Sequence, residues 1–179
     1  MRSAARNGSS TALLLAKLLL FTVLVPGSVT VWLPLYAIYP RIRRAPLGWD
    51  ARVCGAVALV AIGVAGYLWC ALDFAVAGRG TPAPIDPPKL LVARGLYRFS
   101  RNPMYVSVLT VLLGESLLFW SRELLVYAAI VAVAFHLFVM LYEEPVLQAK
   151  MGAAYEDYCE RVPRWFLRLG HRHSRSGPA

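Results

Sequence analysis

The sequence has few of the residues that build disulfide frameworks, metal sites or charged soluble surfaces. Its three cysteines, Cys54, Cys70 and Cys159, are too few and too scattered for a disulfide framework or a zinc site. Charged residues make up 16% of the chain, with 10 acidic against 19 basic. Hydrophobic residues make up 58% of the 179 residues, more than a soluble domain of this length can bury. The excess indicates side chains that face lipid.

The net charge of +9 lies almost entirely outside the long apolar runs. In that position it can meet the anionic headgroups of a membrane. A basic chain can also bind nucleic acid, but this sequence has neither a soluble basic domain with interleaved aromatic residues nor a recognisable binding motif. We therefore expect anionic lipids as partners and no nucleic acid.

Four apolar runs predict an all-α, polytopic membrane protein with a single domain over residues 1–170. Each run is long enough to cross most or all of ~30 Å of hydrocarbon at about 1.5 Å per residue. Pro26, Gly27 and Pro34 are expected to bend the first run. The predicted spans are residues 11–39, 51–77, 103–120 and 124–142.

Three segments differ from the spans. Residues 78–102 are rich in proline and glycine and predict a long functional loop, expected to hold a cofactor. Over residues 143–160, apolar side chains recur at helical spacing among charged ones, which predicts an amphipathic helix at the membrane interface. Residues 171–179 are polar and basic and predict a disordered tail.

The distribution of lysine and arginine predicts the orientation in the membrane. Cytoplasmic segments carry an excess of these residues, which indicates that both termini and the 78–102 loop are cytoplasmic. A soluble cofactor would meet the protein on that side. The brevity of the chain and the lack of a eukaryotic targeting sequence favour a bacterial inner membrane.

Acidic residues and a histidine near membrane depth are candidates for chemistry, because such groups are costly there. Glu143 and Glu144 end the fourth span; the pair can bind ribose hydroxyls or an ammonium group, or can simply mark the helix end at the headgroups. His136 can accept a proton or can hydrogen-bond a neighbouring helix. Glu115 and Asp73 are interpreted as polar bridges between helices.

A second cluster joins the 78–102 loop to the third span. Gly95 permits close approach of the backbone, and Arg101 offers a guanidinium fork for a carboxylate. The helix start at Pro103 exposes N–H groups that attract anions, and two tyrosines offer faces for stacking. Separately these residues are ordinary interfacial anchors, but facing an acidic pair they predict a pocket for a zwitterion with an aromatic base. The cluster consists of Gly95, Tyr97, Arg101, Asn102, Pro103 and Tyr105.

Three motifs follow one another in the second half of the chain. They are Gly95-x-Tyr97-x-x-x-Arg101-Asn102-Pro103-x-Tyr105, then Glu143-Glu144-x-x-Leu147, then Gly152-x-x-Tyr155-x-x-Tyr158-x-x-x-Val162-Pro163. In this order they resemble the isoprenylcysteine carboxyl methyltransferase and phospholipid methyltransferase superfamily of integral membrane enzymes, over about residues 78–165. Asn102 stands where the eukaryotic carboxyl methyltransferases commonly carry histidine, and Met151 stands where the pattern usually has phenylalanine. The first departure leaves the methyl acceptor more open than the cofactor.

The resemblance implies that S-adenosylmethionine binds between residues 95–105 and 143–158, and that a lipophilic acceptor arrives laterally from the bilayer. It implies cofactor contacts from Val92, Gly95, Tyr97, Arg101, Asn102, Pro103, Tyr105, Glu143, Glu144 and Tyr155. Arg101, Glu144 and His136 are the candidate catalytic residues, and Tyr158 and Arg161 the candidate substrate contacts. Methyl transfer from a sulfonium is an in-line displacement that depends on positioning and water exclusion, so no metal is expected.

Several alternatives remain open from the sequence. The acceptor can be a carboxylate, the amine of a phospholipid, or a thiol. An NADPH-dependent membrane reductase of the steroid or sterol type has a similar C-terminal half, although a 2′-phosphate favours a further arginine or lysine cluster in the pocket. A non-catalytic four-helix scaffold is the alternative from another class of protein.

Overall fold

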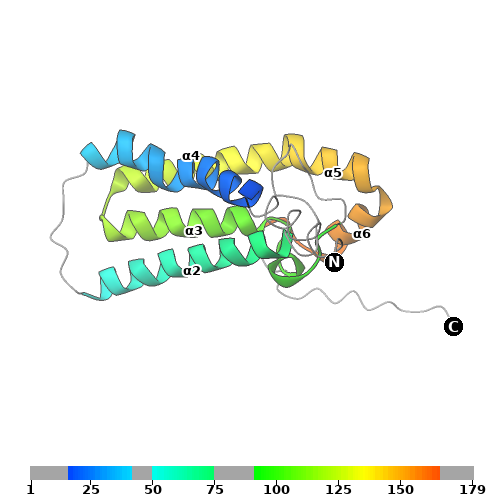
Figure 1. Ribbon diagram of the computed structural model, residues 1–179, viewed down its shortest axis with the longest axis horizontal. Coiled ribbons are helices and arrows are strands. Elements are labelled where there is room, and N and C mark those ends of the chain that lie inside the picture. The colour runs from blue at the N-terminus through cyan, green and yellow to red at the C-terminus, as the bar shows by residue number, and fades with distance from the viewer. Residues whose placement is uncertain (1–15, 42–49, 75–90, 166–179) are drawn as a thin grey trace, which may run out of the picture.

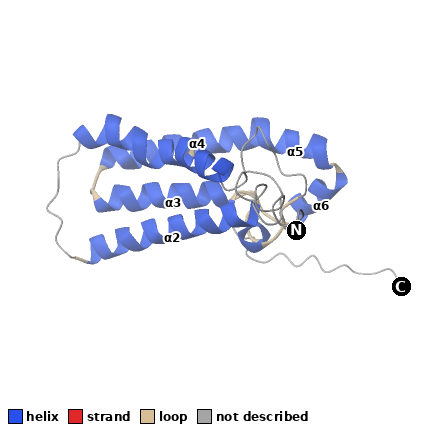
Figure 2. Ribbon diagram, viewed as in Figure 1, coloured by secondary structure: helices blue, strands red, loops and turns tan. Residues whose placement is uncertain are grey.

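The computed structural model describes residues 16–41, 50–74 and 91–165, and within these ranges every regular element is a helix (Figures 1 and 2). Three helices are long and apolar enough to cross a membrane, and a shorter apolar helix packs beside them. The prediction of an all-α membrane protein is confirmed. The long helices are Ala16–Tyr36, Ala51–Asp73 (α2) and Arg122–Met151, and the shorter one is Pro103–Leu118 (α3).

The first helix changes its hydrogen-bonding pattern along its length. Its second half is π-helical, in η1 (Ser28–Trp32) and η2 (Pro34–Ile38), and a 3-10 turn, η3 (Tyr39–Arg41), follows. Proline lacks the N–H that an α-helix needs, and Pro26 lies two residues before η1 while Pro34 starts η2. Each π-helical stretch thus lies at or just after a position where the sequence removes a donor.

Helices α2 and α3 lie side by side and make the closest contact in the bundle (Figure 1). Asp50 caps the start of α2, because its Oδ1 accepts a hydrogen bond of 2.8 Å from the N–H of Val53. A Cβ added to Gly63 would lie 2.7 Å from the carbonyl oxygen of Ser107, and one added to Gly114 would lie 2.7 Å from Cγ2 of Val60. Small residues thus let the two backbones approach, as is common between membrane helices.

The fourth span is longer than predicted. Helix α4 (Arg122–Phe138) continues through a π-helical turn, η6 (Val139–Glu143), into α5 (Glu144–Met151), so that 30 residues form one helix. The helix thus continues beyond residue 142, where the predicted span ends. Pro145, near the start of α5, has no N–H to donate and would interrupt the hydrogen bonds of an α-helix. The π-helical turn before it accommodates the proline, so that the helix continues.

Residues 143–160 do not form the single amphipathic helix that the sequence predicts. Gly152, with φ of 54° and ψ of −132°, ends α5, and a separate helix, α6 (Ala153–Arg161), follows. A glycine is the residue best able to take this conformation at a helix end. The turn folds α6 back toward the bundle (Figure 1).

The other span boundaries differ by a few residues. Helix α2 ends at Asp73 and α3 at Leu118, where Trp120 takes a positive φ of 48° and turns the chain. Some predicted segments lie outside the described residues. They are residues 11–15 of the first span, residues 75–77 of the second span, residues 78–90 of the loop, and the whole tail over 171–179.

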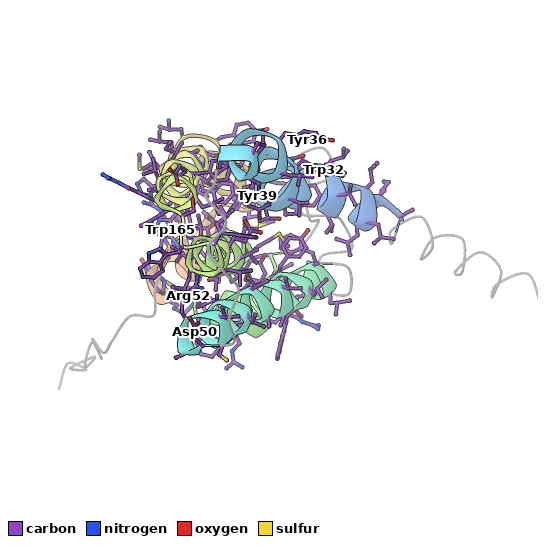
Figure 3. The ribbon with its side chains drawn as sticks, turned by 90° about the vertical axis from the view of Figure 1, so that its left-hand side faces the viewer. Trp32, Tyr36, Tyr39, Asp50, Arg52 and Trp165 are labelled. Atoms are coloured by element: carbon purple, nitrogen blue, oxygen red, sulfur yellow. The ribbon has the colours of Figure 1, made fainter. Side chains whose placement is uncertain are left out.

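The two ends of the bundle have different contents. Figure 3 looks onto one end, where Tyr39, Asp50 and Arg52 lie, and Arg52 donates 3.2 Å and 2.8 Å hydrogen bonds to the carbonyls of Leu117 and Leu118. At the other end, η5 (Gly95–Arg98), α5 and α6 gather (Figure 1). The candidate site lies at this second end.

Candidate functional site

A cavity of about 550 Å³ lies between the segment that leads into α3, the end of the long helix and α6. Its apolar wall includes Phe21 and Val25 of the first helix and Phe135 and Phe138 of α4. Its polar wall comes from residues that the sequence motifs contain. A cavity that is mostly apolar with a few convergent polar groups is typical of a small-molecule site.

Most of the predicted site residues line this cavity. They are Val92, Tyr97, Arg101, Asn102, Tyr105, Glu143, Glu144, Tyr155 and Tyr158. They come from three stretches of sequence, residues 92–105, 143–144 and 155–158, which the fold brings together around the cavity. Among the described residues that line the cavity, Arg101 is the one cation.

Glu144 is held by two arginines. Arg101 Nη1 lies 3.1 Å from Oε1 of Glu144, and Arg164 donates from Nε and Nη2 to Oε1 and Oε2 at 2.8 Å and 2.7 Å. The Glu144 side chain is 16% exposed, so both charge pairs are largely removed from water. The contact with Glu144 raises the pKa of Arg164. Glu144 is therefore a fixed, fully compensated anion.

Arg101 keeps donors that no other described residue uses. Its Nη1 also donates to Sγ of Cys159 at 2.7 Å, whereas its buried Nε has no hydrogen-bond partner in the described part of the chain. A buried donor without a partner is costly, and a ligand is one way to satisfy it. The guanidinium is thus placed to bind a carboxylate or phosphate oxygen.

Glu143 has a different environment from its neighbour. Its Oε2 accepts a 2.7 Å hydrogen bond from the hydroxyl of Tyr105, and within the described ranges no cation pairs with it. Both residues line the cavity. Among the described residues, the phenol of Tyr105 is thus the hydrogen-bond partner of this carboxylate.

Three buried tyrosines close the cavity around these acids. The Tyr158 hydroxyl donates to the Tyr97 carbonyl at 2.7 Å, and burial raises the pKa of Tyr97, Tyr155 and Tyr158 above its usual range. All three hydroxyls therefore keep their protons at neutral pH. Tyr155 and Tyr158 pack with Leu91 and Val162, which fixes α6 against the segment before η5.

Gly95 shapes the loop without lining the cavity. It has a φ of +56°, and a Cβ at this position would lie 2.1 Å from Oδ2 of Asp73. Asp73 in turn accepts a 2.8 Å hydrogen bond from Nε of Arg94. The predicted bridging role of Asp73 thus takes the form of a contact between α2 and η5, and Glu115 is hydrogen-bonded to Tyr39 at the far end of the bundle.

Three other predicted residues also lie outside the cavity lining. His136 accepts a 3.1 Å hydrogen bond on Nδ1 from Nε1 of Trp165. Arg161 is exposed, and its Nε donates to the Asp157 carbonyl one helical turn earlier in α6. Pro103 is buried at the start of α3. The geometry gives none of the three a direct contact with the cavity.

The residue that the sequence interpretation missed is Arg164. It follows the Val162-Pro163 motif, and the chain there leaves the helix and returns to the loop, since Pro163 and Arg164 offer their carbonyls to residues 100–102. The family resemblance points to Arg161 instead. The end of α6 at Val162, signalled by Pro163, is the feature that would have moved attention to Arg164.

A comparison with known families matches residues 51–154 to the family model described as phospholipid methyltransferase. The match begins with α2 and reaches into α6, so it includes residues 91–102, α3 and the long helix, which contribute to the cavity lining. Comparisons with curated proteins and with solved structures found no match.

Proposed function

Since the chain belongs to the phospholipid methyltransferase family, we propose that it transfers a methyl group from S-adenosylmethionine to the amine of a membrane lipid. The family establishes a methyltransferase, and the helices establish an integral membrane protein. The donor and the acceptor are the proposed parts. The family match favours a methyltransferase over the reductase and the scaffold.

One observation carries the choice of acceptor, namely the difference between Glu143 and Glu144. Glu144 is neutralised by two arginines, whereas Glu143 faces the same cavity with a tyrosine hydroxyl as its partner. A carboxylate or thiolate acceptor would be repelled by Glu143 in this low-dielectric site. An ammonium group would be attracted, which supports an amine.

The residues also fit the proposed donor. The cavity has room for a small molecule, the guanidinium of Arg101 in its wall suits the carboxylate of the donor, and the aromatic wall suits its adenine. Arg101, Glu144, Tyr97 and Tyr155 would hold it. When bound, S-adenosylmethionine supplies an electrophilic methyl group on a sulfonium.

Glu143 would then prepare the acceptor. A lipid amine enters protonated, and the Glu143 carboxylate takes its proton while Tyr105 keeps the carboxyl group oriented. The freed lone pair of nitrogen forms the N–C bond as the S–C bond breaks, and that bonding pair stays on sulfur. The apolar wall excludes water from this step, and alignment supplies most of the acceleration.

The lipid would reach the cavity from the bilayer. Phe21 and Val25 of the first helix, with Phe138 of α4, form the apolar wall, and these belong to membrane-spanning helices. Basic residues near this end, such as Arg94, Arg98 and Arg161, would face anionic headgroups on the cytoplasmic side. We propose a bacterial inner membrane as the location.

The donor is tested by calorimetry on protein purified in detergent. We expect S-adenosylhomocysteine to bind wild-type protein and the exposed control Arg98→Ala, binding to Arg101→Ala to be strongly weakened, and NADPH not to bind. Folded wild-type protein that binds NADPH and not S-adenosylhomocysteine would contradict the proposed donor.

The acceptor is tested with methyl-labelled donor and vesicles that differ in one group. We expect label in phosphatidylethanolamine and none in the same lipid with its amine N-acylated. Equal labelling of both lipids would exclude the amine as acceptor, and labelling of an added fatty acid in its place would identify a carboxylate.

A further inference from the structure

Arg164 connects the two halves of the site. Its carbonyl accepts hydrogen bonds from Ser100 Oγ and Asn102 Nδ2 at 3.2 Å and 3.1 Å, and its guanidinium holds both oxygens of Glu144. One residue therefore ties the loop that carries Arg101 to the helix that carries Glu144.

The segment around Arg164 is fixed on both sides. Before it, the Pro163 carbonyl accepts a 2.9 Å hydrogen bond from the backbone N–H of Arg101. After it, Trp165 donates to His136, and its ring lies 6.5 Å from that of Tyr105. The position from which the Arg164 side chain extends is thus determined by contacts with the loop, α4 and α3.

The two arginines make different contacts with Glu144. Arg164 forms the two-pronged contact, while Arg101 makes a single 3.1 Å contact with Oε1. The fork of Arg164 satisfies the carboxylate, so Arg101, which lines the cavity, keeps donors that no described residue uses. Without Arg164, Arg101 would be the sole counterion of Glu144 and would be drawn onto it.

We propose that Arg164 is a positioning residue of the cofactor site. It does not line the cavity and acts by fixing Glu144, which leaves the Arg101 guanidinium free for an anionic group of the bound ligand. The inference rests on the proposed binding of S-adenosylmethionine. The inference also gives the Val162-Pro163 motif a role, since this motif ends α6 and places Arg164 beside Glu144.

The test is the affinity for S-adenosylhomocysteine in Arg164→Ala, Arg164→Lys and the exposed control Arg98→Ala. We expect both Arg164 variants to bind roughly tenfold or more weakly, because loss of one partner leaves a buried charge imperfectly compensated. Lysine keeps the charge but not the fork, so it serves if the alanine variant does not fold. The control is expected to bind as wild type.

Chemical rescue by guanidinium distinguishes a positioning role of Arg164 from a general contribution to the stability of the fold. Guanidinium at a non-denaturing concentration is expected to restore much of the affinity of Arg164→Ala and to leave Arg98→Ala unchanged. Wild-type affinity in both Arg164 variants, or an Arg164→Ala defect that guanidinium does not relieve in folded protein, would overturn the inference. Absence of binding to wild-type protein would instead refute the proposed function, and with it this inference.

Discussion

Two adjacent glutamates show that the surroundings of a side chain determine its partners. Glu143 and Glu144 have the same side chain and line the same cavity, yet one is paired with two arginines and the other with a tyrosine. The position of the pair at the end of an apolar run leaves its role open, and the family resemblance implies that both face the cofactor. The sequence cannot predict their partners, which come from the segment before α3, from α3 and from the segment after α6.

Glu143→Gln tests the division of roles between the two acids. We expect kcat for methyl transfer to fall by about 10²–10⁴, the usual size of a general-base contribution, because the amide cannot take a proton. The affinity for S-adenosylhomocysteine should stay within about threefold of wild type, a difference well below 1.4 kcal/mol. Calorimetry and initial rates on the same preparation check both.

Glu144→Gln should show the opposite pattern, with a weakened ligand affinity as the first effect, because the arginines lose their counterion. The exposed Asp157→Asn serves as the control for loss of an acid near the site. A Glu143→Gln variant with unchanged kcat would remove Glu143 from the proton transfer.

Gly95→Ala and Gly152→Ala form a second test at this scale. Both glycines have a positive φ, of 56° and 54°, so alanine costs about 1–3 kcal/mol of backbone strain at either. A Cβ at Gly95 would also collide with Asp73, whereas nothing lies within 4 Å of one at Gly152. Thermal unfolding in detergent should therefore show the larger loss for Gly95→Ala, and equal losses would mean that Asp73 moves freely.

At the scale of elements, the closest contact is between α2 and α3, and glycines make it possible. Alanine at Gly63 or Gly114 would place Cβ within 3.0 Å of backbone atoms of the other helix, whereas at Gly55 the nearest atom is 3.8 Å away. We expect the first two substitutions to destabilise the protein by about 1–3 kcal/mol, as overpacking does, and Gly55→Ala to be tolerated. Thermal unfolding in one detergent compares the three, and a Gly55→Ala loss as large as the others would contradict this packing.

The elements also show where prediction from sequence stops. The four apolar runs coincide with the three helices that are long enough to cross a membrane and with the shorter apolar α3, because the need to satisfy backbone groups in lipid leaves little choice. The helix of the fourth run continues beyond residue 142 because a π-turn accommodates Pro145, and that turn has no clear sequence signal. The break at Gly152 was not predicted, and the chain after α6 brings Arg164 to Glu144.

For the whole molecule, the two ends of the bundle should lie on opposite sides of the membrane. Asp50, labelled in Figure 3, caps α2 at one end of the bundle, and Ala154 lies in α6 at the other end; both residues are exposed. In a background without native cysteines, an impermeant maleimide added to intact cells should label Asp50→Cys, and should label Ala154→Cys after permeabilisation. The reverse pattern would place the cavity on the outer side.

The length of the long helix links the site to the bilayer itself. Glu143 follows Arg122 on one helix, roughly 32 Å away at a rise of about 1.5 Å per residue, against ~30 Å of hydrocarbon. A thinner membrane makes such a helix tilt or lifts its end out of the lipid, and a thicker one draws that end inward. We therefore expect the acyl-chain length of the surrounding lipid to change the depth at which a lipid headgroup meets Glu143, and with it the rate of the proposed methyl transfer.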